Sequence, residues 1–206
     1  MSATQLDGKY DLVLYGLGVM GENFIRNFAH KGYRVIGVNR TVSVTERFAK
    51  EAVQEGIADR VGTAETLVQA CQHLKSPGGA VLAMINANDP VFQPWGPIDD
   101  LFFRGSVAKY SDTDQREVPA LVDLVPKGTV IIDAANSHPR STRLRCEEFA
   151  KRNILFIGTG TPWSKASWLV HLPVPFWPAR SRITSTIGRP VSMSTMPRIS
   201  VDISMR

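Results

Sequence analysis

The chain has 206 residues, of which 43% are hydrophobic and 21% charged, and its two cysteines, Cys71 and Cys146, stand outside any CxxC pair. A chain of this length can form one domain with its own hydrophobic core. Two cysteines outside any CxxC pair argue against a disulfide framework or a zinc site. We therefore expect the protein in the reducing environment of the cytoplasm. The net charge of +5 comes entirely from residues 159–206, because the 18 basic and 18 acidic residues of 1–158 cancel. We therefore expect no nucleic-acid partner, and the lack of a leader or of ~18 consecutive apolar residues predicts no membrane contact.

The first 158 residues alternate strand and helix patterns. Apolar runs predict strands at residues 10–15, 34–38, 80–85, 129–132 and 154–157. Helical spacing predicts helices at residues 20–30, 43–56, 63–74 and 137–152. Ser43 and Glu46 have capping-box spacing at the start of the second helix. This alternation predicts an α/β fold, with a Rossmann-like, doubly wound, mostly parallel sheet covered by helices on both faces.

Two segments break the alternation. Residues 92–116 interrupt a connection that needs only one short helix, and we interpret them as an insertion loop or disorder. Residues 159–206 hold 6 of the 13 prolines and 3 of the 4 tryptophans without a sustained period of 2 or 3.6. We expect a divergent, disordered tail there, following a Rossmann domain at 1–158.

A glycine motif lies between the first predicted strand and the first predicted helix. Gly16, Gly18 and Gly21 form GLGVMG, a GxGxxG sequence. The first glycine allows a tight turn, the second a close approach of pyrophosphate, and the third close packing of helix against strand. The N–H groups at the start of the helix then face the phosphates. In this context the motif predicts a dinucleotide site.

The end of the second predicted strand indicates which dinucleotide binds. A carboxylate there would accept hydrogen bonds from the ribose 2′-hydroxyl of NAD, but the residues are Asn39, Arg40 and Thr41. Arg40 can hold a 2′-phosphate by forked hydrogen bonds and stack on adenine, and its two neighbours can donate to the same group. The pattern favours NADP over NAD, although an arginine at a strand end can also be a solvated loop residue.

Two stretches of the sequence resemble a known family. GLGVMGENFIRNFAHKGYRVIGVNRT and VPKGTVIIDAANSHPRSTRLRCEEFAKRNILFIGTG are similar to segments of the 6-phosphogluconate dehydrogenases. The resemblance covers about residues 10–91 and 117–160 and implies NADP-dependent oxidative decarboxylation of 6-phospho-D-gluconate to D-ribulose 5-phosphate, in the pentose phosphate pathway. The sibling β-hydroxyacid dehydrogenases share the first motif, and a 3-hydroxyacid substrate remains an alternative.

The resemblance also implies the positions of the cofactor contacts. The pyrophosphate loop comprises Gly16, Leu17, Gly18, Val19, Met20 and Gly21. The 2′-phosphate site comprises Asn39, Arg40 and Thr41. Ile85, Asn86 and Ala87 stand where the family has Val-Lys-Ala beneath the nicotinamide, and Asn136 matches the asparagine that touches nicotinamide and substrate. Ala134 and Ala135 replace two family glycines next to it.

After Gly160 the family pattern stops. The family continues with a substrate-contacting Ser-Gly-Gly-Glu-Glu-Gly run, a catalytic lysine, a glutamate that protonates the enediol, and a helical domain that also builds a homodimer. None has a matching position in this sequence, so we expect no retained catalytic residue and a truncated chain that keeps mainly the NADP-binding part. The alternative function is a non-catalytic NADP(H)-binding remnant. The spacing of the four histidines predicts no metal site.

Overall fold

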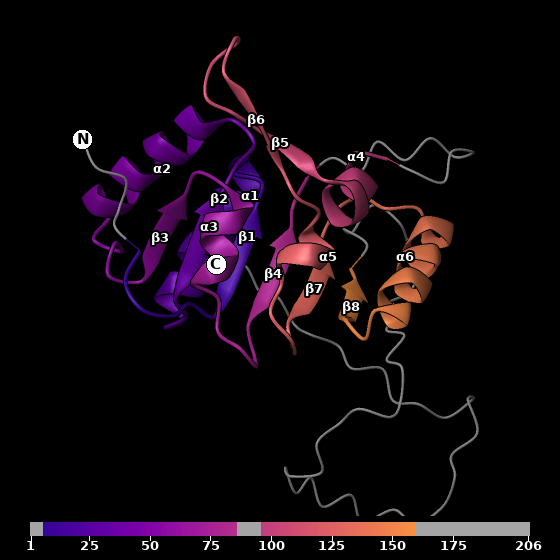
Figure 1. Cartoon of the computed structure of the whole chain (residues 1–206). Coiled ribbons are helices and arrows are strands. Elements are labelled where there is room, and N and C mark those ends of the chain that lie inside the picture. Colours follow the sequence, from indigo (N-terminus) through magenta and orange to yellow (C-terminus); the bar gives the residue numbers. More distant parts are fainter. Residues whose placement is uncertain (1–5, 86–95, 160–206) are drawn as a thin grey trace, which may run out of the picture. The chain divides into compact units, whose positions relative to one another are not determined.

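The computed structural model describes residues 6–85 and 96–159 of the chain. Six strands in this part form one sheet with the order β3-β2-β1-β4-β7-β8 (Figure 1). Their bounds are Leu12–Tyr15 for β1, Val35–Val38 for β2, Val61–Ala64 for β3, Ala80–Ala83 for β4, Val130–Asp133 for β7 and Leu155–Gly158 for β8. All neighbouring pairs are parallel. The predicted parallel sheet is therefore confirmed.

Helices connect the strands and cover both faces of the sheet. One face carries α1 (Val19–His30) and α2 (Val42–Gln54). The other face carries α3 (Leu67–Gln72), the π-helix η1 (Asp100–Arg104), α5 (Leu121–Leu124) and α6 (Pro139–Lys151). The short α4 (Pro97–Asp99) runs directly into η1. No helix in the described ranges is long and apolar enough to cross a membrane.

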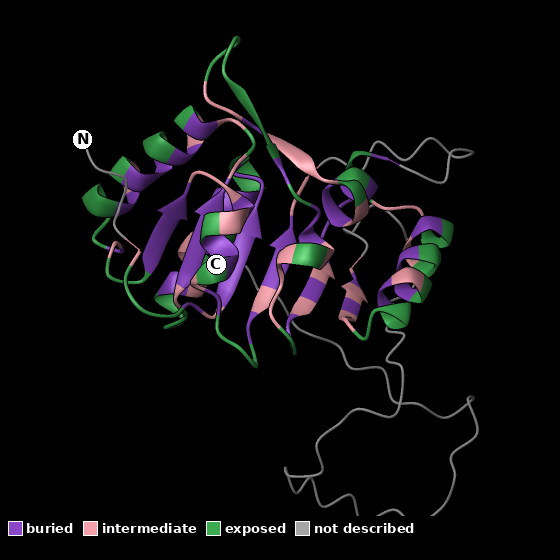
Figure 2. Cartoon of the chain, viewed as in Figure 1, coloured by how far each residue is buried: buried purple, intermediate pink, exposed green. Residues whose placement is uncertain are grey.

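Successive residues of each strand build two separate cores, because side chains alternate between the faces of a sheet. In β1, Leu14 belongs to the core that contains Ile25 of α1 and Phe48 of α2. Its neighbour Val13 belongs to the opposite core, which contains Phe102 of η1. β1, β2 and β3 are buried along their whole length, as Figure 2 shows. Burial on both faces is the reason that β1 is a continuous apolar run in the sequence.

Two predicted helix starts are wrong. The helix predicted from residue 63 begins only at Leu67, and the residues before it form β3, which pairs with β2. A four-residue strand that contains a glycine gives too little pattern to separate it from the helix that follows. The capping box is also wrong, since α2 begins at Val42 with Thr41 at its N-cap and no side-chain cap bond.

The interpretation of residues 92–116 as an irregular loop is wrong for the part from residue 97 onward. That part forms α4, η1 and an antiparallel hairpin of β5 (Ser106–Lys109) and β6 (Gln115–Val118). Both hairpin strands are four residues long, and β6 is mostly exposed, so neither shows the apolar alternation that reveals a strand. Residues 92–95 and the predicted tail at 160–206 lie outside the described residues.

Candidate dinucleotide-binding site

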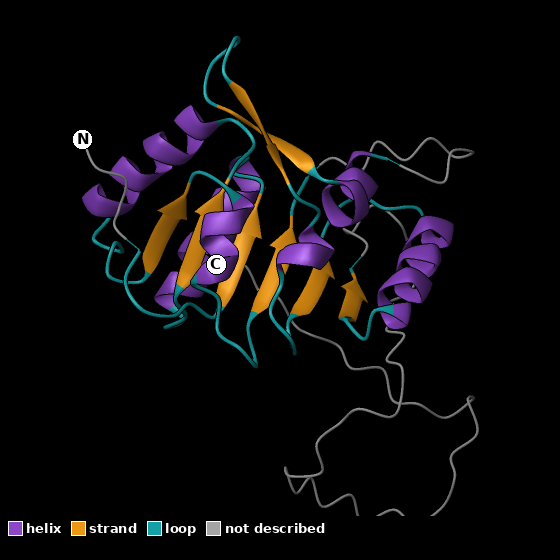
Figure 3. Cartoon of the chain, in the orientation of Figure 1, coloured by secondary structure: helices purple, strands orange, loops and turns teal. Residues whose placement is uncertain are grey.

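The strand order places a topological switch point at the centre of the sheet. From β1 the chain winds outward to β2 and β3, and from β4 it winds the other way to β7 and β8. In open α/β sheets, ligands bind outside the carboxyl ends of the strands at this point. Figure 3 shows these strand ends along one edge of the sheet, and the predicted glycine motif lies between β1 and α1 at this edge.

The three glycines of the motif have three different surroundings. Gly16 has a φ of +112°, and a Cβ added there would lie 2.1 Å from the carbonyl oxygen of Met84. A Cβ added at Gly21 would lie 2.0 Å from the carbonyl oxygen of Gly16, so the helix packs directly on the turn. A Cβ at Gly18 would meet nothing within 4 Å. The turn and the helix contact thus require glycine for the fold, whereas the middle glycine borders open space.

The open space lies at the N-terminus of α1. Gly18 is the N-cap residue, and no side chain caps the helix. Val19 and Met20, the first two residues of α1, are 79% and 55% exposed. Uncapped N–H groups at a helix N-terminus and its positive dipole end favour an anion. The residues predicted for pyrophosphate therefore lie together in a geometry that suits a phosphate.

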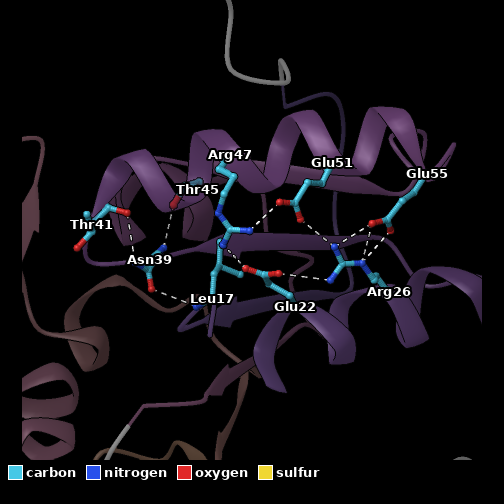
Figure 4. A network of polar contacts seen from close by, with 9 residues as sticks. All are labelled: Leu17, Glu22, Arg26, Asn39, Thr41, Thr45, Arg47, Glu51 and Glu55. Carbon is cyan, nitrogen blue, oxygen red and sulfur yellow. Dashed lines mark hydrogen bonds and ion pairs between the residues drawn. The ribbon is translucent and has the colours of Figure 1, made fainter. Parts of the chain in front are cut away.

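Asn39, at the end of β2, braces the glycine loop from the side (Figure 4). Its Oδ1 accepts a hydrogen bond from the backbone N–H of Leu17 at 3.1 Å, and its Nδ2 donates to the carbonyl oxygen of Thr41 at 3.2 Å. Its own backbone N–H donates to Oγ1 of Thr45 at 3.2 Å. The side chain predicted as a cofactor donor therefore also links the glycine loop to the start of α2.

Arg40 and Thr41 follow directly and lie at the rim of the strand edge. Arg40 is exposed and Thr41 half-buried. The carbonyl oxygen of Arg40 accepts a hydrogen bond from the backbone N–H of Lys109 at 2.7 Å, which joins this turn to the hairpin. No carboxylate occurs among residues 39–41, in agreement with a site for a 2′-phosphate rather than a free ribose hydroxyl.

An ion-pair network joins α1 to α2 beside the loop (Figure 4). Glu22, in the first turn of α1, pairs with Arg26 at 3.4 Å and with Arg47 of α2 at 2.5 Å. Arg26 also reaches Glu51 at 3.0 Å and Glu55 at 2.8 Å, and its hydrogen bonds hold the pKa of Glu55 below the usual range. The charge of Glu22 is therefore compensated beside the position expected for phosphate, and the two helices are fixed relative to each other.

The nicotinamide half of the expected site is formed by the ends of β4 and β7. Ile85 follows β4, and its Cγ2 would lie 3.2 Å from a Cβ at Gly16, so it borders the glycine turn. Asn136 follows β7 and is exposed at the same edge of the sheet. Asn86 and Ala87 lie outside the described residues, and the contacts expected of them stay predictions.

A buried ionic cluster supports the loop that carries Asn136. Arg145 of α6, 1% exposed, donates to both carboxylate oxygens of Asp99, at 2.6 and 2.8 Å. It also donates to Asp133 at 3.1 Å and to Oγ of Ser137 at 2.7 Å. Asp133 in turn accepts hydrogen bonds from the backbone N–H of Ala135 and from Ser137. No sequence pattern predicts this cluster, because Asp99 lies 46 residues before Arg145 in the chain.

Neither cysteine offers a reactive thiol. Cys71 is 3% exposed, and burial raises its pKa to about 12. Burial also raises the pKa of Cys146. Thiolates are the reactive form, so both residues act as core side chains. Within residues 6–85 and 96–159, no group of three or more His, Cys, Asp or Glu side chains could hold a metal ion.

Comparison with known proteins identifies the family of this chain. Residues 11–164 match the family described as the NAD binding domain of 6-phosphogluconate dehydrogenase. The decarboxylating 6-phosphogluconate dehydrogenase of Schizosaccharomyces pombe is 38% identical over 151 residues, which are 73% of this chain and 25% of that protein. The Drosophila melanogaster protein of the same name is 33% identical over 155 residues, 75% of this chain and 27% of that one. The chain thus spans about a quarter of the length of these relatives.

A solved structure has the same fold. The 6-phosphogluconate dehydrogenase of Plasmodium falciparum, studied in its apo form, with its cofactor NADP+ and with its substrate 6-phosphogluconate, superposes with a TM-score of 0.55 at 24% identity. The match covers 72% of this chain and 27% of that one. The Rossmann-like fold class is thereby confirmed.

Proposed function

We propose, because the chain belongs to the 6-phosphogluconate dehydrogenase family, that its Rossmann domain binds NADP. The pyrophosphate lies at the uncapped N-terminus of α1, over Gly18. The adenosine ribose lies over the end of β2, where Arg40 binds the 2′-phosphate. The nicotinamide lies toward Ile85 and Asn136, at the ends of β4 and β7.

One observation favours NADP over NAD as the cofactor. The end of β2 presents an exposed Arg40 in place of a carboxylate, and Asn39 connects this turn to the glycine loop by hydrogen bonds of 3.1 and 3.2 Å. A guanidinium offers five donors in a planar fork that matches phosphate, whereas a ribose diol needs an acceptor. The geometry therefore suits a ligand with two anionic groups, one at the glycine loop and one at the Arg40–Thr41 turn, which Asn39 connects.

We extend the proposal to the reaction named in the relatives, oxidative decarboxylation of 6-phosphogluconate. Bound NADP+ supplies the hydride acceptor for this chemistry. The part of this chain is to hold the nicotinamide at the ends of β4 and β7 and to present the exposed Asn136 to the sugar acid. The resemblance assigns proton transfer to no residue at 6–85 or 96–159.

The test is a titration of the full chain with NADPH and, separately, NADH, followed by nicotinamide fluorescence. Saturable binding with a clear preference for NADPH is the expected result. Equal affinities would contradict the assignment of Arg40 to the 2′-phosphate. A second assay, NADPH formation from NADP+ and 6-phosphogluconate, separates catalysis from binding: turnover supports the dehydrogenase function, and binding without turnover supports a cofactor-binding function alone.

A further inference from the structure

The hairpin β5–β6 crosses the carboxyl ends of three strands of the sheet. At β1, Tyr15 lines the same small pocket as Ser106 of the hairpin. After β2, the carbonyl oxygen of Arg40 accepts from the backbone N–H of Lys109 at 2.7 Å. After β3, Glu65 accepts from the hydroxyl of Tyr110 at 3.0 Å. The hairpin is thus seated along the edge where the adenosine half of a dinucleotide binds in this fold.

The hairpin and the strand ends together line a pocket. Its lining includes Val38 and Arg40 from the β2 side, Thr66 from the β3 side, and Val107 and Val118 from the hairpin. The pocket is small, about 10 Å³, so the hairpin packs closely against these strand ends. Figure 1 shows the hairpin reaching over this edge from the opposite half of the sheet. The hairpin therefore borders the candidate adenosine site directly.

The register of the hairpin places one further cation beside the 2′-phosphate turn. Thr41 and Lys109 are partners in a parallel β-bridge, so their side chains leave the backbone on the same side. Thr41 is one of the three residues predicted to bind the 2′-phosphate. The ammonium of Lys109 is held at 2.7 Å by Asp112, whose side chain is 95% exposed. A partner so exposed to water holds the lysine weakly.

We propose that Lys109 is a second cationic contact for the 2′-phosphate of NADP, delivered by the hairpin, and that it exchanges Asp112 for the phosphate when the cofactor binds. This inference rests on the proposed NADP binding and adds a specificity-determining residue to it. A 2′-phosphate carries up to two negative charges and three acceptor oxygens, so Lys109 and Arg40 can bind it together. NADH has no group at this position and gains nothing from Lys109.

The test compares four forms of the full chain in NADPH and NADH titrations: unmodified, K109Q, D112N and K151Q. Lys151 is the matched control, because it forms the same exposed i, i+3 ion pair, with Glu148 at 2.5 Å, on α6. We expect K109Q to weaken NADPH binding about fivefold, because an exposed ion pair contributes about that much to an affinity. The affinity for NADH should stay unchanged. D112N should strengthen NADPH binding roughly twofold, because it removes the competing carboxylate. K151Q should change neither affinity.

The outcomes separate the two proposals. If the unmodified chain prefers NADPH and K109Q keeps that preference in full, the role of Lys109 is refuted and NADP binding stands. If K109Q weakens NADPH and NADH equally, the lysine supports the fold of the hairpin and does not read the phosphate, which also refutes the inference. If the unmodified chain binds NADPH no better than NADH, the proposed 2′-phosphate site itself is wrong.

Discussion

The two halves of the candidate site are held in place by different kinds of interaction. The adenosine half is built mainly from β1, α1, β2 and α2, where the Leu17–Asn39 hydrogen bond and the ion pairs between α1 and α2 join residues 22 to 25 positions apart and are partly exposed to water. The nicotinamide half depends on a buried cluster in which Arg145 reaches Asp99, 46 residues earlier in the chain. Exposed ion pairs contribute little to stability, whereas a buried charge without its partner is very costly. Replacing a charged residue of the nicotinamide half should therefore lower stability, whereas replacing one of the adenosine half should lower cofactor affinity.

The largest expected effect is on the buried cluster. Arg145→Met leaves the carboxylates of Asp99 and Asp133 buried without their cation, and we expect the free energy of unfolding to fall by about 3–5 kcal/mol. Urea denaturation followed by circular dichroism measures this loss. The matched control on the same helix is Arg143→Met, which removes an exposed pair with Glu147 at 3.7 Å and should cost less than about 0.5 kcal/mol. Similar losses for both variants would show that the cluster does not support the nicotinamide half.

The next effect concerns binding rather than stability. Arg40→Ala should weaken NADPH by roughly 1.5–3 kcal/mol, the range for a hydrogen bond to a charged group, with little change for NADH and in the denaturation midpoint. Arg152→Ala, at another exposed arginine after α6, serves as the control for a general loss of positive charge. A parallel loss for both cofactors would contradict the role of Arg40.

The glycine turn provides a contrast within the adenosine half. Gly21→Ala places a Cβ 2.0 Å from a backbone carbonyl oxygen, and we expect a loss of stability of about 1–3 kcal/mol from overpacking. Gly18→Ala meets nothing within 4 Å, so it should leave stability within about 0.5 kcal/mol. It should nevertheless weaken both cofactors, because its methyl group enters the space expected for pyrophosphate. Thermal unfolding and the two titrations measure both effects, and a stable, normally binding Gly18→Ala chain would argue against a phosphate at this position.

The smallest effect is expected at Asn39. Asn39→Ala removes the acceptor for the Leu17 N–H and the donor to the Thr41 carbonyl, and loosens the loop without removing a charge. NADPH and NADH should both weaken by about 1 kcal/mol, the usual net value of a neutral hydrogen bond. A loss confined to NADPH would instead indicate that the amide contacts the 2′-phosphate directly.

The same contrast explains what the sequence could predict. The strand, glycine turn and helix of the adenosine half follow from local rules over residues 10–41, and their order and type agree with the structure. The sequence does not reveal that Asn39 connects the glycine loop to the Arg40–Thr41 turn, because its partners are backbone groups, which every residue carries. The hairpin was missed because its short, exposed strands show no apolar alternation. The contact of Asp99 with Arg145 depends on how α4 and α6 pack together, and no spacing in the sequence encodes that distance.

The double hydrogen bond of Asn39 has a consequence for how the binding energy of a dinucleotide is divided. Since one side chain fixes both the glycine loop and the Arg40–Thr41 turn, the two anion-binding points cannot shift independently. A ligand that bridges both points meets a preorganised pair and loses its rotational and translational freedom only once. Fragments that carry a single phosphate each lose that freedom separately. The association constant of the intact adenosine bisphosphate half should therefore exceed the product of the association constants of its two separate pieces. Affinities measured with single-phosphate fragments would then underestimate the affinity of the intact cofactor.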